Sequence, residues 1–282
     1  MQPAERRQIG AHYTSERDIL KLVHALFLDD LWAEFETVKN DRRRLPAFHQ
    51  KLGALTFFDP ACGCGNFLVI TYRELRQLEL EVLKLLFGKQ TELTLADINK
   101  LSQVDVDQFY GIEIGEWPAR IAEVALWLMD HQMNLKVSEA FGQLYQRLPL
   151  QKSPHIHCAN ALRLDWKTIL PPDQCSYVLG NPPFVGAKFQ SDEQRTEMKA
   201  IAGDAENHGL LDYVAGWYFK AAEYIQGTRI VGGFVSTNSI SQGEQVGTLW
   251  NHLFRQFKLK IHFAHRTFAW VSEARGGKLP LN

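Results

Sequence analysis

The segment DPACGCGN, residues 59–66, restricts the possible folds of this chain more than any other feature. It follows a short apolar run at 54–58 and precedes a long stretch at 67–87 whose apolar residues recur at helical spacing. Glycines between a strand and a helix leave room for a ligand to approach the backbone closely. The segment therefore predicts a strand, a ligand-binding turn and a helix in succession, which is the repeating unit of α/β folds.

Strands and helices alternate along the rest of the chain. We expect further strands in the apolar runs at 109–114, 156–158, 177–179, 229–236 and 259–264. Helical spacing predicts helices at 15–38, where Ser15 and Asp18 can form the N-terminal cap, and at 118–128 and 211–225. The arginine-rich stretch 39–51 is typical of a solvated linker. This order predicts an α/β fold with a mostly parallel sheet, in which ligands bind at the carboxyl ends of the strands.

Composition argues against several classes of protein. The 31 Lys and Arg residues balance 32 Asp and Glu residues, and 45% of the residues are hydrophobic, which is typical of a globular chain and not of a disordered one. The near-zero net charge gives no general basic surface, so a nucleic-acid function requires a local site. Four cysteines without a CxxC pair, no signal peptide and no apolar run of about 18 residues predict a reduced, cytoplasmic protein without structural zinc or a membrane span.

Two acidic residues stand at the expected ends of the first two strands. Asp59 opens the glycine-rich segment, and a carboxylate there repels phosphate and suits an ammonium group. In dinucleotide sites, the acidic residue follows the glycine-rich segment by about 20 residues, whereas Glu113 follows it at a much greater distance. Glu113 can nevertheless accept hydrogen bonds from both hydroxyls of a ribose. The pair favours an amino acid joined to a nucleoside without phosphates, as in S-adenosylmethionine. Taken alone, the segment is also compatible with a turn in which Asp59 only caps a helix.

The sequence Asn181-Pro182-Pro183-Phe184 follows the expected strand at 177–179. An asparagine amide offers one acceptor and two donors, and the prolines fix the direction of the backbone carbonyls. The Asn181 side-chain oxygen and the Pro182 carbonyl can thus accept both hydrogens of an exocyclic amine. Phe184 can stack on the ring that bears this amine, a contact worth about 1–3 kcal/mol per base. A plain loop with a buried aromatic residue is the alternative interpretation.

In that order, DPACGCGNF, GIEI and NPPF resemble the motifs of amino-methylating DNA methyltransferases. A cofactor loop that precedes NPPF is similar to the gamma class, which makes N6-methyladenine. The segment GAHYTS at 10–15 resembles the stretch before the cofactor loop in that class. The segment FAHRTFAW at 263–270 resembles the methylase part of MmeI-type enzymes, which combine restriction and modification in one polypeptide. The resemblance extends over residues 10–275, nearly the whole chain.

The resemblance implies a Rossmann-like, S-adenosylmethionine-dependent methyltransferase sheet with helices on both faces, and a role for each matching residue. Asp59 holds the methionine part of the cofactor, Glu113 the ribose and Asn160 the adenine amino group, while Ile114 packs on the adenine. The implied cofactor-binding residues are Tyr13, Thr14, Asp59, Ala61, Gly63, Gly65, Asn66, Glu113, Ile114 and Asn160. The implied catalytic residues are Asn181, Pro182, Pro183 and Phe184, with Phe184 and Phe268 in contact with the target base. Cys64 replaces the Ser or Thr common in the family, and Asn160 replaces an acid found in some relatives.

By the same resemblance, the chain is expected to transfer a methyl group from S-adenosylmethionine to adenine N6 in double-stranded DNA, within a restriction–modification or phage-defence system. The target adenine must leave the duplex, at a cost of a few kcal/mol. The expected mechanism requires no metal and no covalent enzyme intermediate. The amine clamp also suits cytosine N4 or a protein glutamine amide, and an inactive cofactor-binding remnant is a further alternative.

The expected organisation is a helical segment at 1–50 that contributes to the cofactor site, followed by a methyltransferase domain at 51–282. In the resembling fold, a last antiparallel strand follows the sixth strand and completes the sheet. Residues 275–282, RGGKLPLN, contain no apolar strand, and Pro280 disfavours one. We therefore expect a domain that lacks this strand and is incomplete at the C-terminus. A target-recognition domain is not expected within the chain and would be a separate or missing part.

Overall fold

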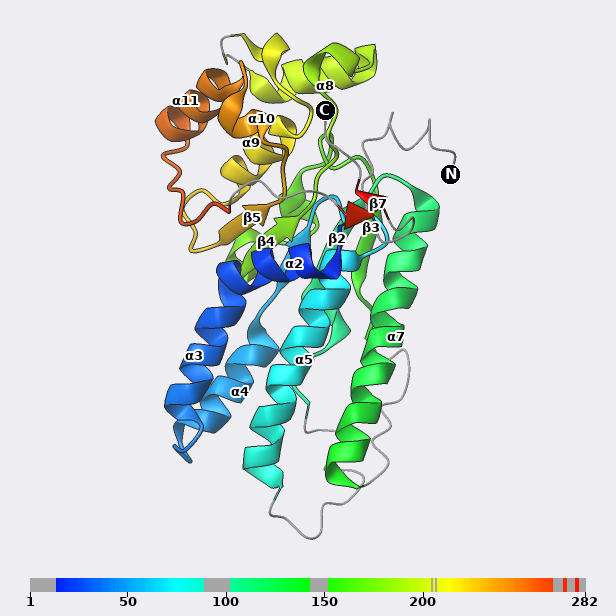
Figure 1. Cartoon of the computed structure of the whole chain (residues 1–282), viewed down its shortest axis with the longest axis vertical. Helices are drawn as coiled ribbons and strands as arrows, with labels where there is room; N and C mark the ends of the chain where they lie inside the picture. The colour runs from blue at the N-terminus through cyan, green and yellow to red at the C-terminus, as the bar shows by residue number, and fades with distance from the viewer. Residues whose placement is uncertain are drawn as a thin grey trace.

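In the computed structural model, the described residues are 14–88, 102–142, 152–203, 205, 207–265, 271–272 and 277–278, the last four by their backbone only. Two predicted site residues, Tyr13 and Phe268, lie outside this part. A parallel five-stranded sheet forms the centre, in the order β3-β2-β1-β4-β5 (Figure 1). The strands are β1 (Phe57–Asp59), β2 (Phe109–Glu113), β3 (His155–Cys158), β4 (Tyr177–Gly180) and β5 (Val231–Phe234). The sheet confirms the predicted α/β class.

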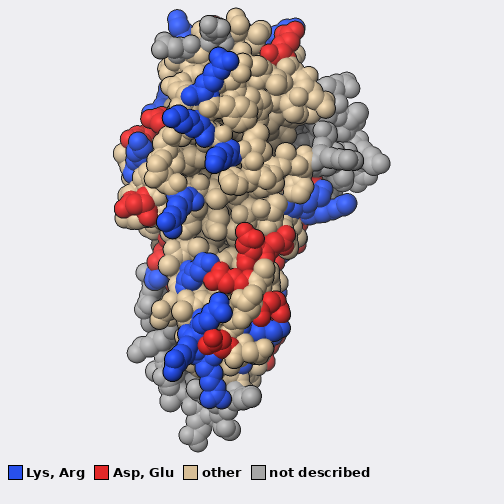
Figure 2. Space-filling model, turned by 90° about the vertical axis from the view of Figure 1, so that its left-hand side faces the viewer, with Lys and Arg blue, Asp and Glu red and all other residues tan. Residues whose placement is uncertain are grey.

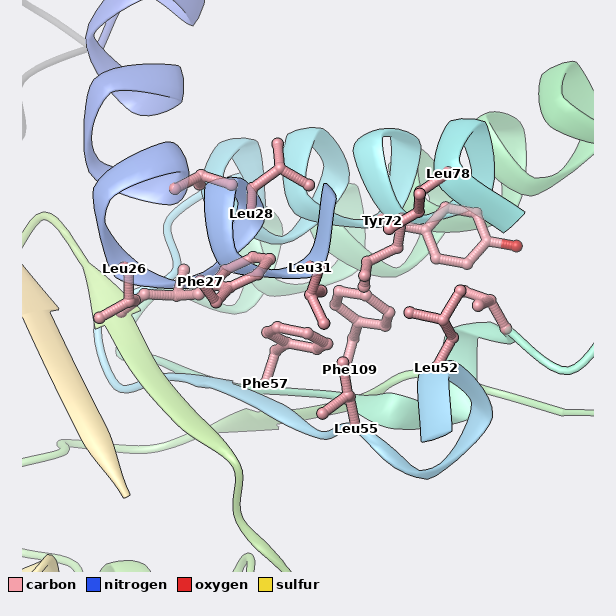
Figure 3. Packing of buried hydrophobic residues seen from close by; sticks show 14 of the residues in the cluster. Leu26, Phe27, Leu28, Leu31, Leu52, Leu55, Phe57, Tyr72, Leu78 and Phe109 are labelled. Carbon is pink, nitrogen blue, oxygen red and sulfur yellow. The ribbon is translucent and has the colours of Figure 1, made fainter. Parts of the chain in front are cut away.

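Successive strand residues face opposite sides of the sheet, and helices cover each side. Phe57 stacks on Phe109 with ring centroids 5.1 Å apart and packs in one core together with Tyr72 (Figure 3). Phe58 faces the other core, where its ring meets that of Trp166 at 5.3 Å. The first core is covered by α2 (Glu16–Val23), α3 (Asp29–Val38), α4 (Arg44–Ala54), α5 (Asn66–Phe87) and α7 (Glu116–Phe141), and the second by α8 (Asp192–Ala202), α9 (Ala215–Tyr224) and α11 (Val246–Gln256). Helices on both faces explain why the strands are almost continuously apolar.

The predicted helix at 15–38 forms one continuous helical stretch. A π-helical turn, His24–Leu28, joins α2 to α3. Ser15 caps α2 as predicted, because its Oγ accepts from the Asp18 N–H at 3.3 Å and donates to the Asp18 carboxylate at 2.8 Å. The buried face of α2 packs over β5, and this position brings Thr14, which directly precedes the cap, to the edge of the sheet where the site lies.

Residues 39–51 do not form the predicted solvated linker, because most of them belong to α4. Leu45, Phe48 and Leu52 recur at helical spacing and are buried. Pro46 lies in the first turn of the helix, where a missing backbone N–H is tolerated. The run of arginines at the start of the segment thus concealed an amphipathic helix that completes the first core.

Residues 259–264 do not form the predicted sixth strand. Lys258 adopts a φ of +52°, and the backbone from there to residue 265 has no regular structure. The alternation of apolar and basic residues there resembles a strand, yet within the described residues nothing pairs with the outer edge of β5. Two short strands further along, β6 (Val271–Ser272) and β7 (Gly277–Lys278), pair with each other in antiparallel fashion and do not join the large sheet.

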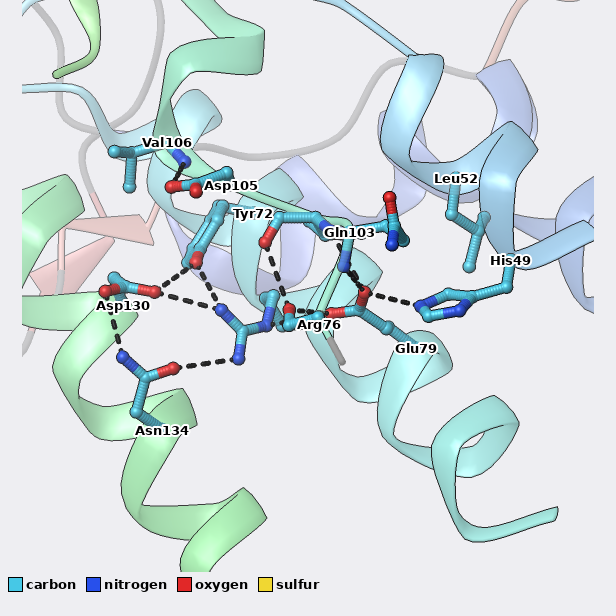
Figure 4. Close-up of polar contacts among 12 residues, drawn as sticks. His49, Leu52, Tyr72, Arg76, Glu79, Gln103, Asp105, Val106, Asp130 and Asn134 are labelled. Atoms are coloured by element: carbon cyan, nitrogen blue, oxygen red, sulfur yellow. Dashed lines mark hydrogen bonds and ion pairs between the residues drawn. The ribbon is translucent and has the colours of Figure 1, made fainter. Parts of the chain in front are cut away.

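A buried polar network ties together the helices of the first core (Figure 4). Arg76 of α5 donates to the carboxylate of Asp130 in α7 at 2.9 Å. Glu79, one turn further along α5, lies 2.9 Å from Nε2 of His49 in α4 and accepts from the backbone N–H of Val104 at 3.0 Å. The network thereby fixes α5, whose first residue is the last of the glycine-rich segment, against α4, α7 and the chain that enters β2.

Across the described residues, no helix combines the length and the apolar character needed to cross a membrane. Cys62, Cys64, Cys158 and Cys175 are free thiols. In the same part of the chain, no three His, Cys, Asp or Glu side chains gather in a group that could hold a metal ion. His155 of the HIHC strand instead stacks on Tyr110, with ring centroids 4.4 Å apart.

Candidate active site

The glycine-rich segment forms a tight turn between β1 and α5, at the carboxyl edge of the sheet. Gly63 and Gly65 adopt φ values of +55° and +85°, in the left-handed region that favours glycine. The Cys62 N–H donates to the Ile112 carbonyl of β2 at 3.0 Å, which holds the turn against the neighbouring strand. A Cβ at Gly65 would lie 3.0 Å from the Ala122 Cβ of α7, so this position also needs glycine for close helix packing.

Asp59 lies at the end of β1, as predicted, with only 1% of its surface exposed. Its Oδ1 accepts from the Ala61 N–H at 2.9 Å, whereas its Oδ2 is buried without a hydrogen-bond partner among the described residues. Burial raises the pKa of this carboxyl to about 8, and the charge of Glu113 adds to the rise. A Cβ at Gly180 would overlap the carboxylate, so the glycine that ends β4 makes space for it. A buried carboxyl with an unused oxygen is suited to a cationic ligand group.

Glu113 lies at the end of β2, beside the turn. Its two carboxylate oxygens accept from the backbone N–H groups of Gly63 at 3.0 Å and of Gly115 at 2.8 Å. Burial raises the pKa of Glu113, and these two N–H groups oppose the rise. Each oxygen keeps further acceptor capacity, so both can accept from neighbouring hydroxyls. Ile114, the next residue, is 61% exposed and offers an apolar surface beside the carboxylate.

These residues fit the ligand that the sequence predicts. The unused oxygen of Asp59 matches an ammonium group, Glu113 matches vicinal hydroxyls, and exposed Ile114 matches the face of an aromatic base. Their order along two adjacent strand ends is the order of the parts in S-adenosylmethionine. Ala61 and Asn66 lie at the start of the turn and at the first position of α5.

Asn181, Pro182, Pro183 and Phe184 follow the end of β4, next to β1 in the sheet. The Asn181 side-chain amide donates to Thr14 Oγ1 at 2.9 Å. Thr14 is buried, so a residue from the N-terminal segment orients the asparagine side chain. Pro182 is buried, and half-buried Phe184 packs against the first core. The structure therefore brings the predicted clamp residues and Thr14 together beside Asp59.

Asn160 lies after β3, two strands away from β1. Its Nδ2 donates to Glu197 of α8 at 2.8 Å, and its Oδ1 accepts from the Leu162 N–H at 2.9 Å. Glu197 also accepts from the hydroxyl of Tyr213 at 2.5 Å. The Asn160 side chain is thus held by α8 and by its own turn, while the N–H of the preceding residue donates to the Glu113 carbonyl at 2.9 Å and keeps Asn160 beside the end of β2.

Trp217 of α9 is a site residue that the sequence analysis missed. Its indole N–H donates to the Pro60 carbonyl at 3.0 Å, so α9 supports the glycine-rich turn from the second core. Gly180 was also missed, although its lack of a side chain makes space for Asp59. The only local signals were a tryptophan on an apolar helix face and a glycine before NPPF.

Comparisons with known proteins relate this site to one family. A family model described as "MmeI, DNA-methyltransferase domain" matches residues 35–278. The chain is 40% identical over 273 residues to "DNA methyltransferase A" of Bacillus subtilis (strain 168), covering 96% of this chain and 30% of that protein. It also matches the structure of the type IIL restriction-modification enzyme MmeI in complex with DNA, with 56% identity and a TM-score of 0.94 over 99% of this chain and 37% of that one.

A structure of a DrdV–DNA complex matches with 16% identity and a TM-score of 0.51 over 89% of this chain, which shows similarity of fold alone. The chain spans about a third of the length of the first two relatives. The resemblance inferred from DPACGCGNF, GIEI and NPPF is confirmed by the family model, which includes all three motifs. This chain belongs to the MmeI DNA-methyltransferase domain family.

Proposed function

We propose that this chain binds S-adenosylmethionine and transfers its methyl group to N6 of an adenine in double-stranded DNA, as part of a restriction–modification or phage-defence system. The observation that carries the proposal is that two polar side chains with different binding properties lie at the ends of neighbouring strands. Asp59, at the end of β1, suits an amino-acid cation, and Asn181, directly after the end of β4, suits an exocyclic amine. The names of the relatives, which include DNA methyltransferases and restriction–modification enzymes, support DNA as the substrate.

In this proposal, S-adenosylmethionine supplies an activated methyl group on its sulfonium sulfur. Asp59 Oδ2 accepts from the α-ammonium group, and Glu113 accepts from the ribose hydroxyls. The backbone of the turn from Ala61 to Gly65 lies against the methionine part, and the left-handed φ values of Gly63 and Gly65 give the turn its shape. Ile114 covers one face of the cofactor adenine. These contacts hold the cofactor at the carboxyl edge, next to the amine that will attack it.

The clamp at 181–184 acts on the target base. The lone pair of adenine N6 is delocalised into the ring, so the amine is a poor nucleophile. Asn181 Oδ1 and the Pro182 carbonyl accept hydrogen bonds from the two N–H groups of this amine. These hydrogen bonds raise the electron density on the nitrogen and favour a tetrahedral geometry. The hydrogen bond from Asn181 to Thr14 holds the amide so that its oxygen is the atom turned toward the base. Phe184 stacks on the ring, and the base reaches this position by leaving the duplex.

Titration calorimetry of the purified chain with S-adenosylmethionine, NADH and ATP tests the cofactor part of the proposal. We expect binding of S-adenosylmethionine alone. An Asp59→Ala variant should lose this binding, whereas an Asp107→Ala control, which removes an acid from the surface at the opposite end of β2, should keep it. Binding of NADH in place of S-adenosylmethionine, or unchanged binding by the Asp59 variant, would contradict the proposal.

A further inference from the structure

Building on the proposed function, we propose that the turn Ala187–Phe189 is a DNA contact that stabilises the flipped state of the target base. Phe189 enters the base stack and fills the gap that the adenine leaves, and Lys188 contacts the adjacent phosphate. The proposal assigns a positioning role in base flipping to residues beyond the clamp at 181–184, on the same loop.

The first observation is the exposure of Phe189. Its side chain is 85% exposed, the highest value among the large apolar side chains of the described residues. A scattered surface aromatic is common in proteins, so exposure alone does not identify a site. Phe189 differs from such residues because it lies five positions after Phe184, within at most about 17 Å of it along the chain. This distance is less than the width of a duplex, so DNA that delivers a base to the clamp can reach this side chain.

The second observation is that the turn is held firmly on both sides. Before it, the buried Val185 accepts through its carbonyl from the Tyr213 N–H at 2.9 Å. After it, the buried side chain of Gln190 donates to the Leu211 carbonyl at 2.8 Å. The turn itself closes with the Phe189 N–H donating to a carbonyl three residues earlier at 2.8 Å. Because the backbone of the turn is already fixed, little backbone entropy is lost when the aromatic side chain inserts between bases. Such a side chain is suited to act as a wedge.

The third observation concerns charge. Two arginines of the same part of the chain are paired: Arg163 contacts Glu193 and Glu197, and Arg195 contacts Asp192 at 3.3 Å. Lys188 is exposed, and no ion pair joins it to an acid in the described part of the chain. In a protein with a formal net charge of −1, an unneutralised lysine beside an exposed aromatic is a local attraction for a phosphate.

Energetics favour a wedge at this place. Extrusion of a paired base costs stacking and pairing, and the cost is smallest when the base is already unpaired or mismatched. An aromatic ring that takes the place of the missing base restores stacking on its two neighbours. The contribution of Phe189 should therefore be large on a matched duplex and small on a duplex in which the target adenine has no partner.

The test compares Phe189→Ala with the wild type in the full-length protein, on an oligonucleotide that contains a methylation site mapped by sequencing. In single-turnover reactions, we expect the variant to be slower by a factor of about 5 to 150 on matched duplex, the range that base–aromatic stacking implies. On the same duplex with an abasic site opposite the target adenine, its rate should be within about twofold of the wild type. Phe189→Trp should restore the rate on matched duplex. For Lys188→Gln, the dependence of DNA affinity on salt concentration should decrease by the amount expected for the loss of about one phosphate contact.

Phe254→Ala is the matched control, because Phe254 is a partly exposed phenylalanine on α11 that stacks on Trp250. Equal slowing of Phe189→Ala on both duplexes, or no slowing on either, would overturn the wedge. A second readout does not require transfer: 2-aminopurine at the target position should fluoresce in the wild-type complex and much less in the Phe189→Ala complex. If the wild type extrudes the base, Phe189→Ala does not, and no methyl group is transferred, the proposed function fails and the wedge stands. If the wild type does not extrude the base, the wedge fails.

Discussion

At the scale of single residues, Asp59 lowers the stability of the free protein while providing a carboxyl group suited to bind a cation. Its carboxyl is buried, and burial raises its pKa to about 8, so the free protein holds it protonated at neutral pH. One oxygen is satisfied by the Ala61 N–H and the other has no partner among the described residues. Such an arrangement is unfavourable for folding alone, and the proposed function accounts for it by a ligand that brings a positive charge.

Asp59→Asn should therefore stabilise the free protein. The folded-state pKa of Asp59 is raised above the unfolded value, so its contribution to stability is fully present below about pH 4 and is lost as the pH rises through about 8. Asparagine does not titrate, so the variant should gain up to a few kcal/mol over the wild type between pH 5 and pH 9. Urea unfolding at several pH values measures this difference. A variant that is less stable than the wild type at pH 8 would contradict the buried, uncompensated carboxyl.

Cofactor binding should release a proton below pH 8. The ammonium group of S-adenosylmethionine would lower the pKa of Asp59, so the affinity should rise with pH toward about 8, by at most tenfold per pH unit. Calorimetry in buffers of different ionisation enthalpy measures the proton release directly. The same affinity at pH 6 and pH 8, without proton release, would show that Asp59 does not contact the cation.

At the scale of elements, the glycine-rich turn depends on one helix-to-helix contact. Gly65 and Gly142 both adopt left-handed φ values, +85° and +65°, so alanine is strained at either position by roughly 1 kcal/mol. Only at Gly65 would the new Cβ also lie 3.0 Å from Ala122. Gly65→Ala should therefore lower both stability and cofactor affinity, whereas Gly142→Ala should lower stability alone and by less. Equal effects of the two variants on cofactor affinity would refute the role of the α5–α7 contact.

The buried network on α5 should matter far more than surface ion pairs. Arg76 is fully buried and pairs with Asp130 and Glu79, so Arg76→Met removes the positive charge that faces these two carboxylates and should cost about 3–5 kcal/mol of unfolding free energy. Arg120 pairs with Glu123 while 63% exposed, so Arg120→Met should cost less than about 1 kcal/mol. Chemical denaturation of the two variants gives the comparison, and similar losses would mean that the network does not stabilise the fold.

Much of the fold was predictable from local patterns, and the errors have physical causes. The five strands and the polar residues at their ends were predicted from apolar runs in the sequence. This works because both faces of a parallel sheet are buried, so its strands are apolar on both sides. The helix α4 was missed because Arg42 and Arg43 precede it and Pro46 lies in it, although Pro46 occupies a turn that tolerates proline. The strand predicted at 259–264 was wrong because an alternating pattern forms a strand only beside a pairing partner. The support that Trp217 gives to Pro60 was not predictable, since the two residues are 157 positions apart.

At the scale of the whole molecule, the polar side chains of the candidate site lie together at the carboxyl edge of the sheet. Asp59, Glu113 and Asn181 come from segments far apart in sequence, and the parallel order β2-β1-β4 brings them to one edge. Figure 2 shows Lys and Arg interleaved with Asp and Glu along one face, in keeping with the formal net charge of −1. If the proposed function holds, phosphate contacts have to be local, and specificity for a DNA sequence is a property that the clamp itself does not provide.

The most direct test is mass spectrometry of nucleosides from unmethylated genomic DNA, after incubation with the protein and S-adenosylmethionine that carries a deuterated methyl group. We predict labelled N6-methyladenine with the wild type. With Asn181→Ala, we predict a loss of about a hundredfold or more in the rate, while the affinity for S-adenosylmethionine stays within about twofold. Label in N4-methylcytosine, label in no nucleoside although the cofactor binds, or full activity of Asn181→Ala would contradict adenine transfer by this clamp.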